Sequence, residues 1–259
     1  MPAELKSESR DQTMVLTIND PQTRNALSPD IYAAGVEALN GAERNRDIRS
    51  VVITGANGMF SAGGNLNRLQ ARRLESAEEQ ARGVNALHGW IDTIRNFPKP
   101  VIAAVEGAAA GAGFSLALAC DFIVASREAT FIMAYARVGL SPDGGGTWSI
   151  TNALPRQLAM EILMGADKVD VQRLHALGVV NRVSQPGYAL EDALAWANQI
   201  NQRAPNALIS IKELVGDARS NSLHQHLDQE RDQFVRNLSH ANAGEGITAF
   251  FEKRPPRYQ

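Results

Sequence analysis

Two apolar segments of this chain each run directly into a turn rich in glycine and alanine. Residues 50–54 (SVVIT) precede the loop 55–65, and residues 101–105 (VIAAV) precede the turn 107–113 (GAAAGAG). A short β-branched run bounded by glycine is typical of a buried strand. Such turns present backbone N–H groups without bulky side chains, at places where a helix can begin. The chain is therefore expected to form a sheet with helices at the ends of its strands.

The remaining segments indicate an α/β core followed by helices. Further strands are predicted at 14–18, 122–125 and 179–183, and a helix begins at Ser28 and Pro29, an N-cap and first-turn pair. A charged stretch leads into a helix that ends before Pro98, and its predicted apolar stripe is Val84, Leu87, Ile91 and Ile94. We expect a core over 1–195 and a helical region over 196–259. The apolar anchors of that region, which we expect to pack on the core or on a neighbouring subunit, are Phe234, Ile247, Phe250 and Phe251.

Charge and cysteine content exclude several classes of protein. The formal net charge is −2 over 259 residues, so nothing attracts the chain generally to nucleic acid or to an anionic membrane. The single cysteine, Cys120, lies in an apolar run and is expected to be buried, which leaves no disulfide framework or cysteine zinc site. The first residues are polar, no stretch is apolar enough to span a membrane, and the last three residues form no peroxisomal signal. We expect a cytoplasmic protein.

The two glycine-rich turns favour an oxyanion hole, because two N–H donors after buried strands can converge on one oxygen. The spacing fits equally well a second interpretation, in which the glycines only let strand and helix pack closely. A dinucleotide loop is a poor interpretation, because Leu116 occupies the third glycine position of that motif.

Asp143 is the carboxylate most suited to chemistry, since three glycines follow it and leave its side chain access to a ligand. A carboxylate beside the α-carbon of a thioester can move a proton. The alternative is an N-cap for the helix that contains Thr147 and Trp148. Ser115 resembles the serine of a nucleophile elbow and could act with Asp143 and His175 in a hydrolase. Ala117 replaces the last glycine of that motif, so a serine that lines the substrate or the core is favoured.

The other polar residues favour structural roles. His88 lies beside an apolar stripe and is expected to be a core histidine. His224 and His226 are two residues apart on a predicted helix, so they do not share a face and predict no metal site. A solvated helix face best explains the basic residues interleaved with Glu75, Glu78 and Glu79, which are Arg68, Arg72, Arg73 and Arg82.

Three ordered motifs resemble the signatures of the enoyl-CoA hydratase/isomerase (crotonase) family. They are residues 60–66 (FSAGGNL), residues 99–121, which contain the second glycine-rich turn, and residues 139–147 (GLSPDGGGT). Residues 249–254 (AFFEKR) also resemble the family's last helix. The likeness implies a crotonase-like spiral of ββα units, a helical C-terminal trimerisation region, and trimers or dimers of trimers.

The resemblance also implies a site. The backbone N–H groups of Gly64 and Ala112 would form the oxyanion hole, with Asp143 as the catalytic carboxylate. Coenzyme A would enter as part of an acyl-CoA substrate, with no separate cofactor and no metal. The residues expected to bind substrate or CoA are Arg24, Ala26, Ala62, Leu66, Gly111, Ser115, Tyr135, Phe250 and Lys253, the last two near the CoA nucleotide of the same or an adjacent subunit.

Departures from the family pattern bear on the reaction. Hydratases of the family carry two glutamates, at the positions of Ser115 and Tyr135 here. Addition of water needs one group to activate the water and another to deliver a proton, whereas moving a double bond needs a single base. Asp143 matches the catalytic aspartate of the isomerase subgroup, which includes the ring-1,2-epoxyphenylacetyl-CoA isomerases. A family dehalogenase has a histidine where this chain has Asp92. We therefore expect an isomerase, with a hydratase, a thioester hydrolase and a non-catalytic CoA-ester binder as alternatives.

Overall fold

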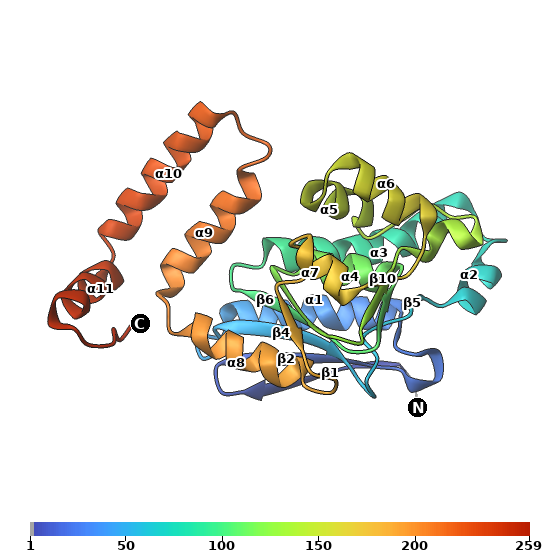
Figure 1. Ribbon diagram of the computed structural model, residues 1–259, viewed down its shortest axis with the longest axis horizontal. Coiled ribbons are helices and arrows are strands. Elements are labelled where there is room, and N and C mark those ends of the chain that lie inside the picture. The colour runs from blue at the N-terminus through green and yellow to red at the C-terminus, as the bar shows by residue number, and fades with distance from the viewer. Residues whose placement is uncertain (1–2) are drawn as a thin grey trace.

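The computed structural model describes residues 3–259 and has a six-stranded sheet at its centre (Figure 1). The strand order is β1 (Glu4–Arg10), β2 (Thr13–Asn19), β4 (Ser50–Gly55), β6 (Val101–Val105), β8 (Phe122–Ser126) and β11 (Arg182–Ser184). β1 pairs antiparallel with β2, and the other neighbours pair parallel. The strands predicted within β2, β4, β6 and β8 are confirmed. The strand expected at 179–183 begins later, at Arg182.

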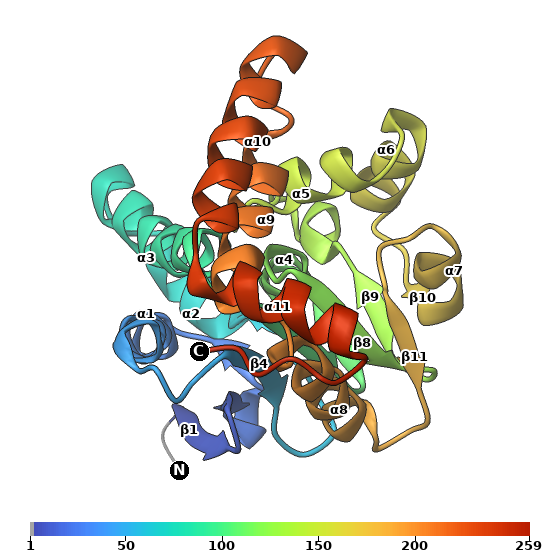
Figure 2. The same cartoon turned by 90° about the vertical axis from the view of Figure 1, so that its left-hand side faces the viewer.

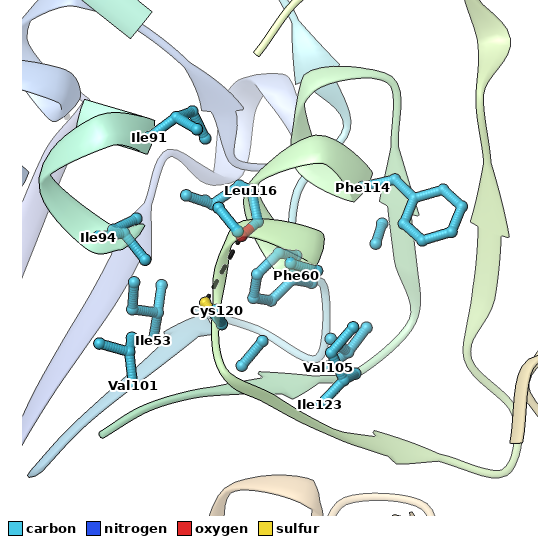
Figure 3. Packing of buried hydrophobic residues seen from close by; sticks show 14 of the residues in the cluster. Ile53, Phe60, Ile91, Ile94, Val101, Val105, Phe114, Leu116, Cys120 and Ile123 are labelled. Atoms are coloured by element: carbon cyan, nitrogen blue, oxygen red, sulfur yellow. Dashed lines mark hydrogen bonds between the residues drawn. The ribbon is translucent and has the colours of Figure 1, made fainter. Parts of the chain in front are cut away.

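The central strands β2, β4, β6 and β8 are apolar at successive positions and are buried on both faces, whereas the edge strand β1 is polar and exposed. Val15, Val52 and Ile102 face α8 (Ala189–Asn201). Their sequence neighbours belong to the larger core on the other face, under α1 (Pro29–Arg44) and α3 (Ala77–Asn96). Figure 3 shows part of this larger core, where the buried thiol of Cys120 donates to the carbonyl oxygen of Leu116 at 3.5 Å. Cys120 is therefore a core residue, as predicted.

Each central strand is followed by a short strand and then by helices, which is the expected spiral of ββα units. β4 leads to β5 (Gly63–Gly64), α2 (Leu66–Arg72) and α3, and β6 leads to β7 (Ala108–Ala110) and α4 (Ala112–Ala119). β8 leads to β9 (Thr130–Ile132), α5 (Gly146–Ala153) and α6 (Arg156–Gly165). The short strands pair with one another: β7 with β9, β9 with β10 (Val169–Asp170), and β5 with β3 (Ala26–Leu27). This pairing brings the turns after different central strands together.

Local signals account for the starts of two helices. The N–H of Ile31 donates to Ser28 Oγ at the start of α1, and Pro29 is the first helical residue, as predicted. Helix α3 begins with a capping box formed by Ser76 and Glu79.

The predicted stripe of α3 is correct at Leu87, Ile91 and Ile94 but wrong at its first position. Val84 is exposed, because it lies in the half of α3 that extends past the core, and Trp90 is buried instead. The prediction that His88 is a core histidine is also wrong, since its side chain is exposed. The buried positions 87, 90, 91 and 94 occupy one face of the helix, and residue 88 falls beside that face.

The C-terminal helices extend away from the sheet (Figures 1 and 2). They are α9 (Pro205–Asp217), α10 (Leu223–Leu238) and α11 (Ala241–Glu252), which we call the helical arm. The predicted anchors on α10 and α11 are at least half exposed. The expected boundary at 195/196 lies within α8, and the division into two domains stays a prediction. Within residues 3–259, no helix is both long enough and apolar enough to cross a membrane.

Candidate active site

The first glycine-rich loop is fixed against the loop that precedes α1. The N–H of Ala62 donates to the carbonyl oxygen of Arg24 at 3.0 Å, and Ser61 Oγ donates to that of Asn25 at 2.8 Å. Gly63 has φ +82°, and a Cβ atom there would collide with the carbonyl oxygen of Ala110. Only glycine fits this close approach without strain. The loop therefore brings Gly63, the residue before Gly64, against the second turn.

The second turn ends at the start of α4. Gly111 has φ +51°, and its N–H donates to the carbonyl oxygen of Ile132 at 2.8 Å. Ala112 is the first residue of α4, where N–H groups have no intrahelical acceptor and the helix dipole favours negative charge. A Cβ built on Gly63 would lie 3.1 Å from the nitrogen of Ala112, so the two turns touch. The structure thus places Gly63, the residue before Gly64, against Ala112, and the oxyanion hole formed by Gly64 and Ala112 stays a prediction.

Asp143 receives hydrogen bonds from residues 115 and 135. Tyr135, in the 3-10 helix η2 (Ala134–Val138), donates its hydroxyl to Asp143 Oδ1 at 2.6 Å. Ser115 Oγ donates to the main-chain carbonyl oxygen of Asp143 at 3.0 Å. Asp143 is not an N-cap, because α5 begins after Gly145 and has no side-chain cap. The capping alternative is therefore wrong, and the carboxylate is available for chemistry.

Tyr135 acts as a donor because its phenol resists ionisation. Burial raises the pKa of Tyr135, and the nearby carboxylate of Asp143 raises that pKa further. A phenol is already protonated at neutral pH at its ordinary pKa, so Tyr135 donates its proton to the carboxylate under these conditions.

Ser115 lacks the partners of a hydrolytic nucleophile. Its side chain is fully buried, and its hydroxyl donates to the main chain of Asp143. His175 lies on α7 (Val171–Ala176), where Nδ1 is 2.8 Å from the carbonyl oxygen of Val180. Within residues 3–259 no hydrogen bond joins Ser115 to His175, so the arrangement does not match a Ser–His–Asp relay.

The residues expected to bind CoA fall into two groups. Arg24, Ala26, Ala62 and Leu66 surround the pairing of β3 with β5, beside Gly64, and both Arg24 and Leu66 are exposed. Phe250 and Lys253 lie at the end of α11, on the opposite side of the molecule in Figure 1 from β5 and α2. Phe250 is 79% exposed. One chain therefore brings the first group to the candidate site and leaves the second group away from it.

Arg68 and two apolar residues lie at the site although sequence reasoning gave them no role there. Arg68 Nη2 donates to the carbonyl oxygen of Leu27, the register partner of Gly64, at 2.6 Å. Arg68 and Arg72 are both half-buried, so their assignment to a solvated face is wrong. Cβ atoms built on Gly144 and Gly145 would touch Leu87 and Ile91, so these side chains of α3 line the base of the Asp143 loop. Leu87 and Ile91 belong to the apolar stripe predicted for α3, and that stripe was the sequence signal that could have indicated their position.

A surface groove lies elsewhere, between α1 and α3. It measures about 670 Å³ and is lined by α1 residues, including Tyr32 and Val36, together with Ala86 of α3. None of Gly64, Ala112 and Asp143 lines it. No group of three or more histidine, cysteine, aspartate or glutamate side chains in the described chain is placed to hold a metal ion.

Known proteins of similar sequence and fold include several that are named for CoA thioesters. The family described as enoyl-CoA hydratase/isomerase matches residues 8–259. The chain is 33% identical to the 1,2-epoxyphenylacetyl-CoA isomerase of Escherichia coli K12, over 95% of this chain and 94% of that protein. It is 32% identical to the 2,3-dehydroadipyl-CoA hydratase of the same bacterium, over 99% of both. A crystal structure of an enoyl-CoA hydratase from Polaromonas sp. JS666 is 63% identical, covers 98% of this chain and 99% of its own, and superposes with a TM-score of 0.98. The chain belongs to the enoyl-CoA hydratase/isomerase family of enzymes.

Proposed function

We propose that the chain is an acyl-CoA isomerase that shifts a double bond, or rearranges a ring epoxide, in a CoA thioester. The observation that carries this proposal is the single carboxylate among the three positions that converge on the site. Asp143 is hydrogen-bonded by Tyr135 and Ser115, which occupy the two positions where hydratases of the family carry glutamates. A lone carboxylate suits proton transfer between two carbons better than addition of water.

In the proposed reaction the thioester oxygen accepts hydrogen bonds from the N–H groups of Gly64 and Ala112. Asp143 takes a proton from one carbon of the acyl chain, and the electrons of that C–H bond delocalise into a dienolate. The two N–H groups stabilise the negative charge that develops on the oxygen, and each such donor typically contributes about 3–4 kcal/mol. Asp143 then returns the proton to a different carbon, which completes the shift.

The relatives support both the isomerase and its main alternative. The Escherichia coli relative is named an isomerase, whereas the other relative and the Polaromonas structure are named hydratases. A hydratase is therefore the second candidate. Incubating the protein with 3-enoyl, 2-enoyl and aromatic epoxide CoA esters distinguishes them, because isomerisation leaves the mass unchanged and hydration adds one water. Thiol release would instead support the hydrolase, and binding without turnover would support the CoA-ester binder.

The role of Asp143 is tested by Asp143→Asn, which keeps the shape of the side chain and removes the base. We expect kcat to fall by about 10²–10⁴-fold, while CoA-ester affinity stays within about twofold. Asp47→Asn is the matched control, because Asp47 is exposed and precedes β4, at the opposite end of that strand from the loop that contains Gly64. An Asp143→Asn enzyme with the activity of the wild type would refute the assignment.

We further propose that the active form is a homo-oligomer, a trimer or a dimer of trimers. The exposed apolar side chains of the helical arm support this, since clustered exposed apolar side chains often mark a protein–protein interface. The most exposed of them are Val215, Leu223, Phe234, Phe250 and Phe251. In such an assembly Phe250 and Lys253 of one subunit would reach the CoA nucleotide at the site of another.

A further inference from the structure

Asp143 is held at both its main chain and its side chain. Its carbonyl oxygen accepts hydrogen bonds from Ser115 Oγ at 3.0 Å and from the N–H of Gly146 at 3.1 Å. Its carboxylate oxygen Oδ1 accepts from the hydroxyl of Tyr135 at 2.6 Å. In the described part of the chain, Oδ2 has no hydrogen-bond partner. The protein therefore occupies one carboxylate oxygen and leaves the other available.

The phenol that contacts Oδ1 is itself supported rigidly. The carbonyl oxygen of Tyr135 accepts from the N–H of Leu140 at 3.1 Å and also from that of Gly139. The tyrosine ring lies over Gly111, where a Cβ atom would be 3.7 Å from the ring carbon Cζ. Gly111 immediately precedes Ala112, the second proposed oxyanion donor. Tyr135 thus lies between Gly111, in the second glycine-rich turn, and the carboxylate of Asp143.

Space between the Asp143 loop and Ser115 of α4 is limited. A side chain at Gly146 would meet Ser115 Oγ at 2.5 Å, and one at Gly144 would meet Ser115 Cβ at 3.1 Å. Both glycines therefore let the Asp143 loop approach α4 closely enough for Ser115 to hold its main chain. The carboxylate can rotate only by breaking its bond to Tyr135.

We infer that Tyr135 is a positioning residue, whose hydroxyl fixes Oδ1 of Asp143 so that Oδ2 alone removes the proton and returns it within one catalytic cycle. This inference rests on the proposed isomerase function. The Oδ2 lone pair forms an O–H bond as the first C–H bond breaks, and the released electron pair enters the dienolate. When the dienolate takes the proton at a different carbon, the same O–H bond breaks and the carboxylate is restored. The hydroxyl of Tyr135 keeps its own proton throughout.

A carboxylic acid held in this way has one route for its proton, which leads back to the substrate. Without the phenol, the protonated side chain can turn and exchange its proton with water before the second transfer. The fraction of substrate hydrogen retained in the product therefore reports on the orientation of Asp143, independently of how much enzyme is active.

The test compares Tyr135→Phe with the wild type on a 3-enoyl-CoA that carries deuterium at both C2 positions. We expect kcat to fall by about 10- to 100-fold, the loss typical of one hydrogen bond to a charged group. We expect KM to stay within about twofold and the deuterium transferred to C4, read by mass spectrometry, to fall at least about twofold, because exchange then competes. Tyr188→Phe is the matched control, since it removes the same atom from a side chain that is 60% exposed.

Three results would overturn the inference. One is a Tyr135→Phe enzyme with the kcat and deuterium transfer of the wild type. Another is a higher KM at unchanged kcat, which would make Tyr135 a substrate-binding residue. The third is a lower kcat and a lower melting temperature at unchanged deuterium transfer, which would make its role structural. Failure of the proposed function looks different, because the wild type would then isomerise none of the esters, and the inference would fall with it.

Discussion

Helices α3 and α10 begin in the same way but lie in opposite surroundings. Each opens with a capping box, formed by Ser76 and Glu79 in α3 and by Ser222 and Gln225 in α10. Leu87, Trp90, Ile91 and Ile94 of α3 are buried in the core, whereas α10 has no buried residue. Local sequence thus determines where each helix starts, whereas packing against the core determines which of its residues are buried.

The candidate site and the helical arm differ in the same way, because the site is held by contacts within one chain and the arm exposes its apolar side chains. Asp143, Tyr135 and Ser115 are held by hydrogen bonds within one chain, so the proposed base is in place without a partner. Phe250 and Lys253 lie on the arm, away from that site, and the arm's apolar side chains face outward. CoA binding through Phe250 and Lys253 would thus require the assembly, whereas the position of the proposed base would not.

The largest effect on stability should come from truncating a buried core side chain of α3. Trp90 is fully buried, and its ring lies 6.3 Å from that of Tyr32. Trp90→Ala should lower the free energy of unfolding by about 3–5 kcal/mol, measured by chemical denaturation, because it leaves a large cavity. The counterpart on the arm is Phe234→Ala, at a side chain that is 67% exposed. It should weaken subunit association and make unfolding more dependent on protein concentration.

Sedimentation of the two variants provides the control. Trp90→Ala should keep the assembly state of the wild type at temperatures where it is folded, and Phe234→Ala should shift it toward smaller species. A Phe234→Ala protein of unchanged size and reduced stability at every concentration would show that the arm packs on its own core.

A smaller effect is expected at the joint between the two regions. Lys212 of α9 contacts Asp121 Oδ2 at 2.7 Å, and the same carboxylate oxygen accepts from the N–H of Val101 at 2.8 Å. Lys212→Met leaves the carboxylate without its cation and should cost about 2 kcal/mol. This is less than for a fully buried pair, because the two side chains remain 16% and 23% exposed. The loss should appear in denaturation curves and as faster amide exchange in α9.

The contribution of the Lys212–Asp121 contact to the free energy of unfolding should also depend on pH. Burial raises the pKa of Asp121 above its ordinary value of 3.8, although Lys212 and the N–H of Val101 oppose the shift. As pH rises from 3.8 through the raised pKa, the folded chain holds this proton more tightly than the unfolded chain does. The contribution of Asp121 to the free energy of unfolding therefore falls over that range. Asp121→Asn should remove this slope, and an unchanged slope would exclude Asp121 as its source.

The parts of the fold that could be predicted from the sequence depend on local signals. Apolar runs followed by glycine located β4 and β6, and Ser28 with Pro29 located the start of α1. The short strands β3, β5 and β7 could not be predicted, because two or three residues carry no periodicity and pair only through neighbours distant in sequence. His88 shows a related error, since lying next to a stripe does not set which way a helical side chain points.

Individual residues of the candidate site could be named from the sequence, but the contacts between them could not. Asp143 and Ser115 were identified from their local sequence, and Tyr135 from family resemblance. The hydrogen bond from Tyr135 to Asp143 depends on the 3-10 helix η2 and on the left-handed Gly111, which no pattern in the sequence indicates. Arg68 was placed on the solvent face because alternating charges do not show which arginine turns inward.

The smallest effect should come from removing the caps that α3 and α10 share. Ser76→Ala and Ser222→Ala each remove a side chain that accepts a hydrogen bond from the third helical N–H, which is worth about 1 kcal/mol. Because α3 is anchored by its buried half, Ser76→Ala should speed amide exchange only in its first turn. With no buried residue to hold α10, Ser222→Ala should speed exchange along several turns in the separated subunit. Equal exchange patterns in the two variants would mean that α10 is held as firmly as α3, and that the contrast between core and arm is one of exposure alone.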